Sequence, residues 1–126
     1  MSELIVGVDW VSVVVGAVLA FALGAAWYSQ TLFGKKWIEG SRIDPSKGSP
    51  MRAMAAQAAG TFFLSWLIGI TARENMLMTA ILVAVTAATL IKANGLFAQK
   101  STYAIVVEST FVLAMVAVMI AVHGIL

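Results

Sequence analysis

The chain has 126 residues, of which 61% are hydrophobic and only 11% are charged, whereas soluble domains carry about 25% charged residues. This composition excludes a soluble globular protein, and the small net charge of +2, from 8 basic and 6 acidic residues, excludes the basic surface that nucleic-acid binding requires. The absence of cysteine and the single histidine, His123, exclude a thiolate or histidine-rich metal site and a cysteine nucleophile, so we expect no metal, no cofactor and no catalytic residues.

Four apolar stretches are long enough to cross a bilayer. A hydrocarbon core about 30 Å thick needs about 20 apolar residues in a helix, because each backbone polar group must be hydrogen-bonded within the segment. The stretches are approximately residues 11–28, 53–72, 76–97 and 103–125. The sequence therefore predicts an all-α protein, in which residues 1–126 form one integral membrane domain with four transmembrane helices.

Acidic and basic residues indicate how the spans are oriented. The first ten residues hold Glu3 and Asp9 but no Lys or Arg, so they lack the basic start of a signal peptide and we expect the first span to be retained. The connection 29–52 carries five basic residues and the third connection carries Lys100, whereas the second connection holds only Arg73. Because cytoplasmic loops are enriched in Lys and Arg, we predict that connection 29–52 is cytoplasmic and that both termini lie outside.

Between the first two spans, residues 30–39 mix apolar and charged side chains. The aromatic and aliphatic residues of this segment alternate with Lys35, Lys36 and Glu39. This pattern is typical of a short amphipathic segment that lies in the headgroup layer. Residues 40–50, which follow, have the Gly, Ser and Pro composition of a solvated loop.

Small residues spaced four apart occur in the first two spans. In lipid, helices associate through close packing, and small residues allow their backbones to approach. The first span carries Gly16, Ala20 and Gly24, and the second carries Ala56 and Gly60. We expect these faces to pack within the monomer, and an interface between copies is the alternative.

Two charged residues fall inside the predicted spans, Lys92 in the third and Glu108 in the fourth. A charge near the bilayer centre costs about 2.5–3.5 kcal/mol on insertion scales, so each residue needs a partner or a route to water. Because the two are equally far along the chain from Lys100, one arrangement is an inward-facing ion pair across the hairpin. In other arrangements Lys92 extends to the headgroups, or Glu108 is protonated or bonded to a hydroxyl. Gln57 and Asn94 lie at comparable depth and complete the intramembrane polar candidates.

Residues 27–37 read Trp-Tyr-Ser-Gln-Thr-Leu-Phe-Gly-Lys-Lys-Trp. This segment resembles the W-Y-x-x-x-x-F-G-K-x-W signature of a widespread family of small bacterial membrane proteins, a domain of unknown function with four predicted spans. The stretch from Asn94 to Phe111, which contains Glu108, is similar to the family's second recurrent stretch. The resemblance implies the same fold and a bacterial inner-membrane location, and it implies no activity. We interpret the matching residues as an interfacial signature, namely Trp27, Tyr28, Phe33, Gly34, Lys35 and Trp37.

Two functional hypotheses follow from these features. We favour a non-enzymatic membrane protein that forms homo-oligomers or serves a larger membrane complex as an accessory subunit, in contact with lipids and not with nucleic acid. The alternative is a small proton-coupled transporter or channel that uses Glu108 and Lys92, since intramembrane ionisable residues are functional candidates. Members of the family often carry an aromatic-His pair after the buried polar residue, where this chain has Phe111 and Val112, and this difference weakens a proton relay.

The predicted orientation is testable with single cysteines, because the chain has none of its own. In intact cells, a cysteine replacing Ile43 should be protected from a membrane-impermeant maleimide, whereas a cysteine replacing Ser2 should be labelled. Disrupted cells, in which both positions should react, provide the control. Labelling of Ile43→Cys from outside would contradict the orientation.

Overall fold

The computed structural model describes residues 2–29, 31–44 and 50–126. Within these ranges the chain forms helices and no strands, which confirms the predicted all-α class. Two short helices, α1 (Ser2–Ile5) and α3 (Gly34–Ser41), accompany four helices that are long and apolar enough to cross a membrane. The long helices are α2 (Trp10–Trp27), α4 (Met51–Arg73), α5 (Leu77–Phe97) and α6 (Thr102–Ile125). They indicate a multi-pass membrane protein.

The observed helices follow the hydropathy pattern closely. Each long helix begins and ends within two residues of its predicted span. Gln30 in the amphipathic segment, and Lys47 with the rest of 45–49 in the basic connection, lie outside the described residues.

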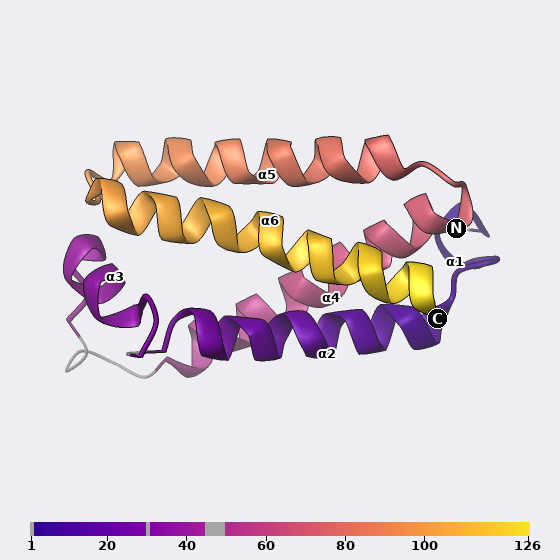
Figure 1. The fold of residues 1–126 in the computed structure, drawn as a ribbon, viewed down its shortest axis with the longest axis horizontal. Coiled ribbons are helices and arrows are strands. Elements are labelled where there is room, and N and C mark those ends of the chain that lie inside the picture. The colour runs from indigo at the N-terminus through magenta and orange to yellow at the C-terminus, as the bar shows by residue number, and fades with distance from the viewer. Residues whose placement is uncertain (1, 30, 45–49) are drawn as a thin grey trace.

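Helix α6 lies at the centre of the bundle. It packs against α2, α3, α4 and α5, and most of the buried side chains in the core belong to it. Figure 1 shows α5 and α2 running along opposite sides of α6, while α4 crosses behind them at an angle. The end of α6 lies near α1 and the start of α2, and α3 lies at the opposite end of the bundle (Figure 1).

Side-chain caps and left-handed residues define several helix ends. The Asp9 carboxylate accepts hydrogen bonds from the backbone N–H and the hydroxyl of Ser12, 3.2 and 2.7 Å long, at the start of α2. These bonds hold the pKa of Asp9 below its usual value. Asn75 has a φ of 54° in the short turn between α4 and α5, a conformation that asparagine tolerates better than most residues. The turn therefore holds the end of α4 close to the start of α5.

The small residues of α2 allow a close approach to α4 and α6. Gly16 and Ala20 are buried, and a Cβ at Gly16 would lie 2.8 Å from the hydroxyl oxygen of Ser65 on α4. That hydroxyl donates a 2.8 Å hydrogen bond to the carbonyl oxygen of Val13 on α2. A Cβ at Gly24 would lie 3.0 Å from the ring of Phe111 on α6. The second half of α4 is thereby held tightly against α2.

The first half of α4 is exposed, whereas its second half carries buried residues. All residues from 51 to 60 are exposed, and a Cβ at Gly60 would meet nothing within 4 Å. We expected Ala56 and Gly60 to pack within the monomer, and the structure instead leaves this face open. The reason is the crossing angle of α4, which carries its first half away from α5 and across the bundle (Figure 1).

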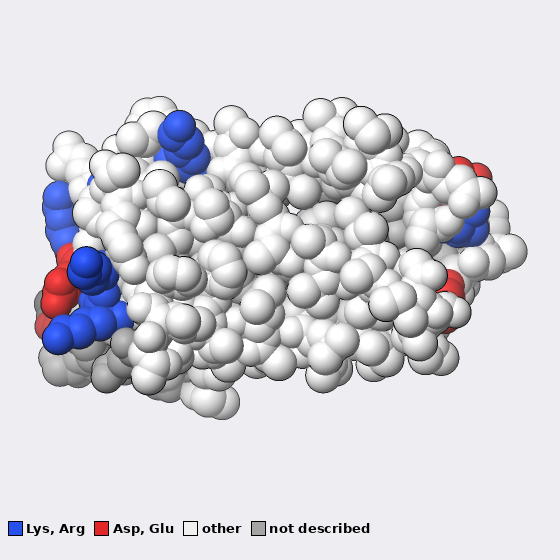
Figure 2. All heavy atoms as spheres, in the orientation of Figure 1, with Lys and Arg blue, Asp and Glu red and all other residues white. Residues whose placement is uncertain are grey.

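Charged side chains gather toward the two ends of the molecule. Figure 2 shows a broad uncharged surface between them, as expected for a helix bundle that faces hydrocarbon. The end near α1 carries a single basic side chain, Arg73, on the described part of the chain, together with acidic residues. The opposite end carries Lys35, Lys36, Arg42, Arg52 and Lys100.

Candidate functional site

The aromatic residues of segment 27–37 form a compact cluster. The ring centroids of Trp27 and Phe33 are 5.0 Å apart, and those of Tyr28 and Trp37 are 4.5 Å apart. Both pairs are tilted, an arrangement that aromatic rings favour over a face-to-face stack. The cluster therefore folds the segment back on itself immediately after α2.

This aromatic cluster also packs on α6. The rings of Trp27 and Tyr28 lie 5.9 and 5.1 Å from the ring of Phe111. The indole N–H of Trp27 donates a 3.1 Å hydrogen bond to the carbonyl oxygen of Val107. The segment is thus docked on α6, and its expected location in the headgroup layer stays a prediction.

Gly34 makes the turn into α3 possible. A Cβ at this position would overlap the carbonyl oxygen of Tyr28, so a side chain cannot be accommodated without moving the backbone. The N–H of Gly34 donates a 2.8 Å hydrogen bond to the carbonyl oxygen of Ser29. Lys35, which follows, is exposed. The glycine is therefore a packing requirement, and the lysine is free to reach the headgroups.

The far end of α3 is tied to the turn between α5 and α6. The Arg42 guanidinium donates a 2.7 Å hydrogen bond to the carbonyl oxygen of Gln99. The N–H of Ser101 donates a 3.0 Å hydrogen bond to the carbonyl oxygen of Gly40. Both ends of α3 are thus anchored, and this orients the side chain of Trp37 between them.

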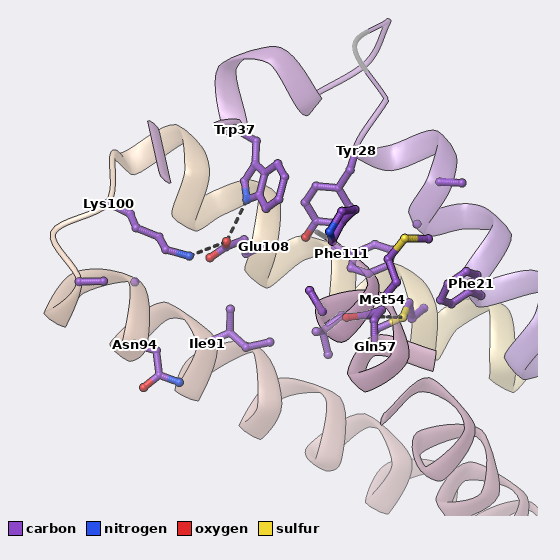
Figure 3. Close-up of a pocket in the computed structure, with 18 residues that line it drawn as sticks. Phe21, Tyr28, Trp37, Met54, Gln57, Ile91, Asn94, Lys100, Glu108 and Phe111 are labelled. Carbon is purple, nitrogen blue, oxygen red and sulfur yellow. Dashed lines mark hydrogen bonds and ion pairs between the residues drawn. The ribbon is translucent and has the colours of Figure 1, made fainter. Parts of the chain in front are cut away.

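Glu108 on α6 is bound by two donors from different elements. The ammonium group of Lys100 lies 2.7 Å from its Oε2 atom, and the indole N–H of Trp37 donates a 2.9 Å hydrogen bond to the same oxygen. Figure 3 shows the two side chains converging on the carboxylate. The side chains of Glu108 and Lys100 are 16% and 27% exposed, so the ion pair is largely withdrawn from solvent and lipid.

Lys92 does not pair with Glu108 in this structure. It is exposed and lines a shallow depression with Ser109 and Leu113, whereas Glu108 faces a different cavity on the other side of the contact between α5 and α6. The two residues have similar depth in the membrane but point to opposite sides of that contact. The inward ion pair between Lys92 and Glu108 that the sequence suggested is therefore wrong. Glu108 pairs with Lys100 instead.

The other two polar candidates do not join Glu108. The amide of Gln57 on α4 donates a 3.2 Å hydrogen bond to the hydroxyl oxygen of Thr61, one turn further along the same helix. Asn94 is exposed, and Figure 3 shows its amide pointing away from the carboxylate. In the described part of the chain, His, Asp and Glu residues form no group of three that could hold a metal ion.

A cavity of about 800 Å³ opens between α4 and α5, and we call it the α4–α5 cleft. It exists because the first half of α4 diverges from α5 while the turn at Asn75 joins their other ends. Glu108 lies in its wall, together with aromatic residues of segment 27–37. Labelled lining residues in Figure 3 include Phe21, Tyr28, Trp37, Gln57, Lys100 and Glu108.

Sequence reasoning missed both partners of Glu108. The amphipathic pattern of residues 30–39 placed Trp37 at the membrane interface. Lys100 was placed in the turn between the third and fourth spans. One signal was available for Trp37: an indole N–H in an apolar setting requires an acceptor, and Glu108 is the acidic residue of the predicted fourth span. The reach of the Lys100 side chain depends on its rotamer, which no sequence pattern specifies.

Residues 11–124 match the family described as "Protein of unknown function (DUF1761)". The chain belongs to this family. The matched range includes the aromatic segment 27–37 and Glu108, so the site lies within the DUF1761 domain. No curated protein and no solved structure shows significant similarity to the chain.

The choice of partner for Glu108 is testable with two double-mutant cycles. Lys100→Met and Glu108→Gln should show a coupling energy of about 1 kcal/mol or more, because each single change leaves the other charge without its partner. Lys92→Met and Glu108→Gln should couple by less than about 0.5 kcal/mol, as expected for residues without contact. Both cycles are measured by reversible unfolding in mixed detergent micelles. A larger coupling with Lys92 than with Lys100 would contradict the structure.

Proposed function

We propose that this DUF1761 protein is a non-enzymatic membrane protein that assembles with further copies of itself or within a larger membrane complex. The open face of α4 carries the proposal. Residues 51–60 are exposed, and they include Ala56 and Gly60, whose small side chains allow another helix to approach closely. In lipid, such faces are a main source of helix association, because burial from water contributes nothing there.

We further propose that the protein resides in a bacterial inner membrane with the α3 end in the cytoplasm. The basic residues of the described chain support this orientation. Five of them lie at the α3 end, against Arg73 at the other, and cytoplasmic loops carry such an excess. The aromatic residues of segment 27–37 lie at the same end, where they suit the membrane interface.

The assembly proposal is tested with a matched pair of substitutions on α4. Ala56→Leu enlarges the proposed contact face, whereas Ala58→Leu makes the same change about 200° around the helix. Both alanines are exposed, so neither leucine meets a buried core. We expect Ala56→Leu to weaken self-association about tenfold, or about 1.4 kcal/mol, and Ala58→Leu to change it by less than about twofold. Energy transfer between differently labelled copies in liposomes measures the association.

Two outcomes would contradict this proposal. The first is a wild-type protein that is monomeric at every protein-to-lipid ratio and that retains no partner after purification in mild detergent. Alternatively, the two leucine variants would weaken association equally, which would place the contact elsewhere.

A second role, a small proton-coupled carrier, is favoured by one specific observation. The Glu108 carboxylate lines a cavity of about 800 Å³ that opens between two transmembrane helices, and intramembrane carboxylates commonly mark ion and substrate pathways. Lys100 takes the place that the sequence suggested for Lys92, since it is the cation that contacts Glu108.

The carrier role predicts that proton movement depends on Glu108. In proteoliposomes with an entrapped pH-sensitive dye, the wild-type protein should collapse an imposed pH gradient several-fold faster than Glu108→Gln. Lys92→Gln is the control and should match the wild type, because Lys92 lies outside the α4–α5 cleft. Equal rates for all three proteins and for empty liposomes would rule the carrier role out.

A further inference from the structure

The charged side chains that line the α4–α5 cleft lie at one end, and the other end is mostly apolar, with the amide of Gln57 beside Met115. Lys100, Glu108 and Trp37 lie together at the α3 end, and Figure 3 shows Phe21 at the opposite end. Met115, which also lines the cleft, is two turns further into the membrane than Glu108, or about 10 Å at 1.5 Å per residue. This gradient matches a molecule with one charged end and a hydrocarbon body, oriented with its charged end toward the α3 side.

The two oxygens of Glu108 have different surroundings. Both donors, Lys100 and Trp37, bind Oε2, and no hydrogen bond from the described part of the chain goes to Oε1. Figure 3 shows both dashed contacts ending on the same oxygen of the carboxylate. The carboxylate is therefore held in place by one oxygen while the other retains its capacity to accept.

Aromatic side chains lie on one side of the carboxylate (Figure 3). Tyr28 and Trp37 pack against one another at 4.5 Å, and Phe111 lies 5.1 Å from Tyr28; all three line the cleft. Aromatic rings attract organic cations, and clusters of them bind quaternary ammonium groups. A carboxylate oxygen beside several aromatic rings is thus a combination that favours a cation with low hydration.

We propose that the α4–α5 cleft binds an organic cation with a hydrocarbon body, which enters from the membrane between α4 and α5. Its charge lies next to Oε1 of Glu108 and the rings of Tyr28 and Trp37, and its apolar part extends toward Phe21 and Met115. The volume of about 800 Å³ lies within the range of about 300–1,000 Å³ that holds drug-sized ligands. The proposal rests on the carrier role and names its substrate class, although binding does not require transport.

The charges of the cleft select against an anionic ligand. Among the lining residues that the structure describes, Lys100 is the one cation, and its ammonium group is already paired with Glu108 at 2.7 Å. An anionic head would meet the second carboxylate oxygen and the negative faces of the aromatic rings. A zwitterionic phospholipid would likewise find no unpaired cation for its phosphate among these residues.

Two ions of the same shape and opposite charge test the proposal. Tetraphenylphosphonium and tetraphenylborate are titrated into the purified full chain in uncharged detergent micelles, and the heat of binding is measured against empty micelles. We expect the cation to bind the wild-type protein with one site per chain. The anion should show no heat beyond that of empty micelles.

Three variants locate the binding. Glu108→Gln should weaken cation binding at least about tenfold, because the residue loses its charge with little change of shape. Lys100→Gln should strengthen cation binding about threefold or more, since a like charge beside the site is removed. Lys92→Gln should leave the affinity unchanged, because Lys92 lies outside the cleft. Opposite effects of the first two variants cannot arise from a general loss of folding.

The proposal is overturned if both ions bind equally, if Glu108→Gln binds the cation as the wild type does, or if Lys100→Gln binds it no more tightly than the wild type. Should Glu108→Gln fail to fold, the Lys100→Gln result decides alone. The two experiments distinguish failure of the carrier role from failure of the binding site. Cation binding with these variant effects but without proton movement would reject the carrier and retain the site, whereas proton movement through Glu108 without cation binding would do the reverse.

Discussion

The arrangement of the α3 end depends on one carboxylate that lies inside an apolar helix. A charge in that position is costly unless it is paired and hydrogen-bonded, and Glu108 obtains both from Lys100 and Trp37. For the indole to reach it, α3 must lie across α6, and this in turn requires a backbone contact at Gly34 that no side chain permits. The aromatic segment and the acid of the fourth span, about 70 residues apart in sequence, therefore act as a single structural unit.

A second constraint comes from α4, whose two halves pack differently. Its second half packs closely on α2 through Ser65 and Gly16, and the short turn at Asn75 fixes its end beside α5. Because α4 crosses the bundle at an angle, its first half must diverge (Figure 1). The divergence leaves the α4–α5 cleft on one side and the face with Ala56 and Gly60 on another. The proposed assembly and the proposed ligand site thus have one geometric cause.

Individual residues of the site were predictable, but their partners were not. Glu108 stood out because it interrupts an apolar run, and the aromatic segment stood out by its resemblance to a family signature. The pairing with Lys92 was inferred from equal depth, and depth is only one coordinate of a residue on a helix. The direction around the helix axis is the other, and it places Lys92 on the far side of the contact between α5 and α6. Gln57 and Asn94 were grouped with Glu108 for the same reason, and neither binds it.

The helical class, and the number and approximate ends of the apolar helices, follow from hydropathy along the amino-acid sequence. These properties are local, because a backbone in hydrocarbon must satisfy its hydrogen bonds within each segment, so hydropathy and length suffice. The packing of the helices in three dimensions determines which small-residue faces close and which stay open, which cation binds Glu108, and that a cleft exists. Those outcomes depend on the rotation and crossing angle of whole helices. Such angles arise from many weak contacts at once, as between Gly16 and Ser65, and no single segment of the sequence encodes them.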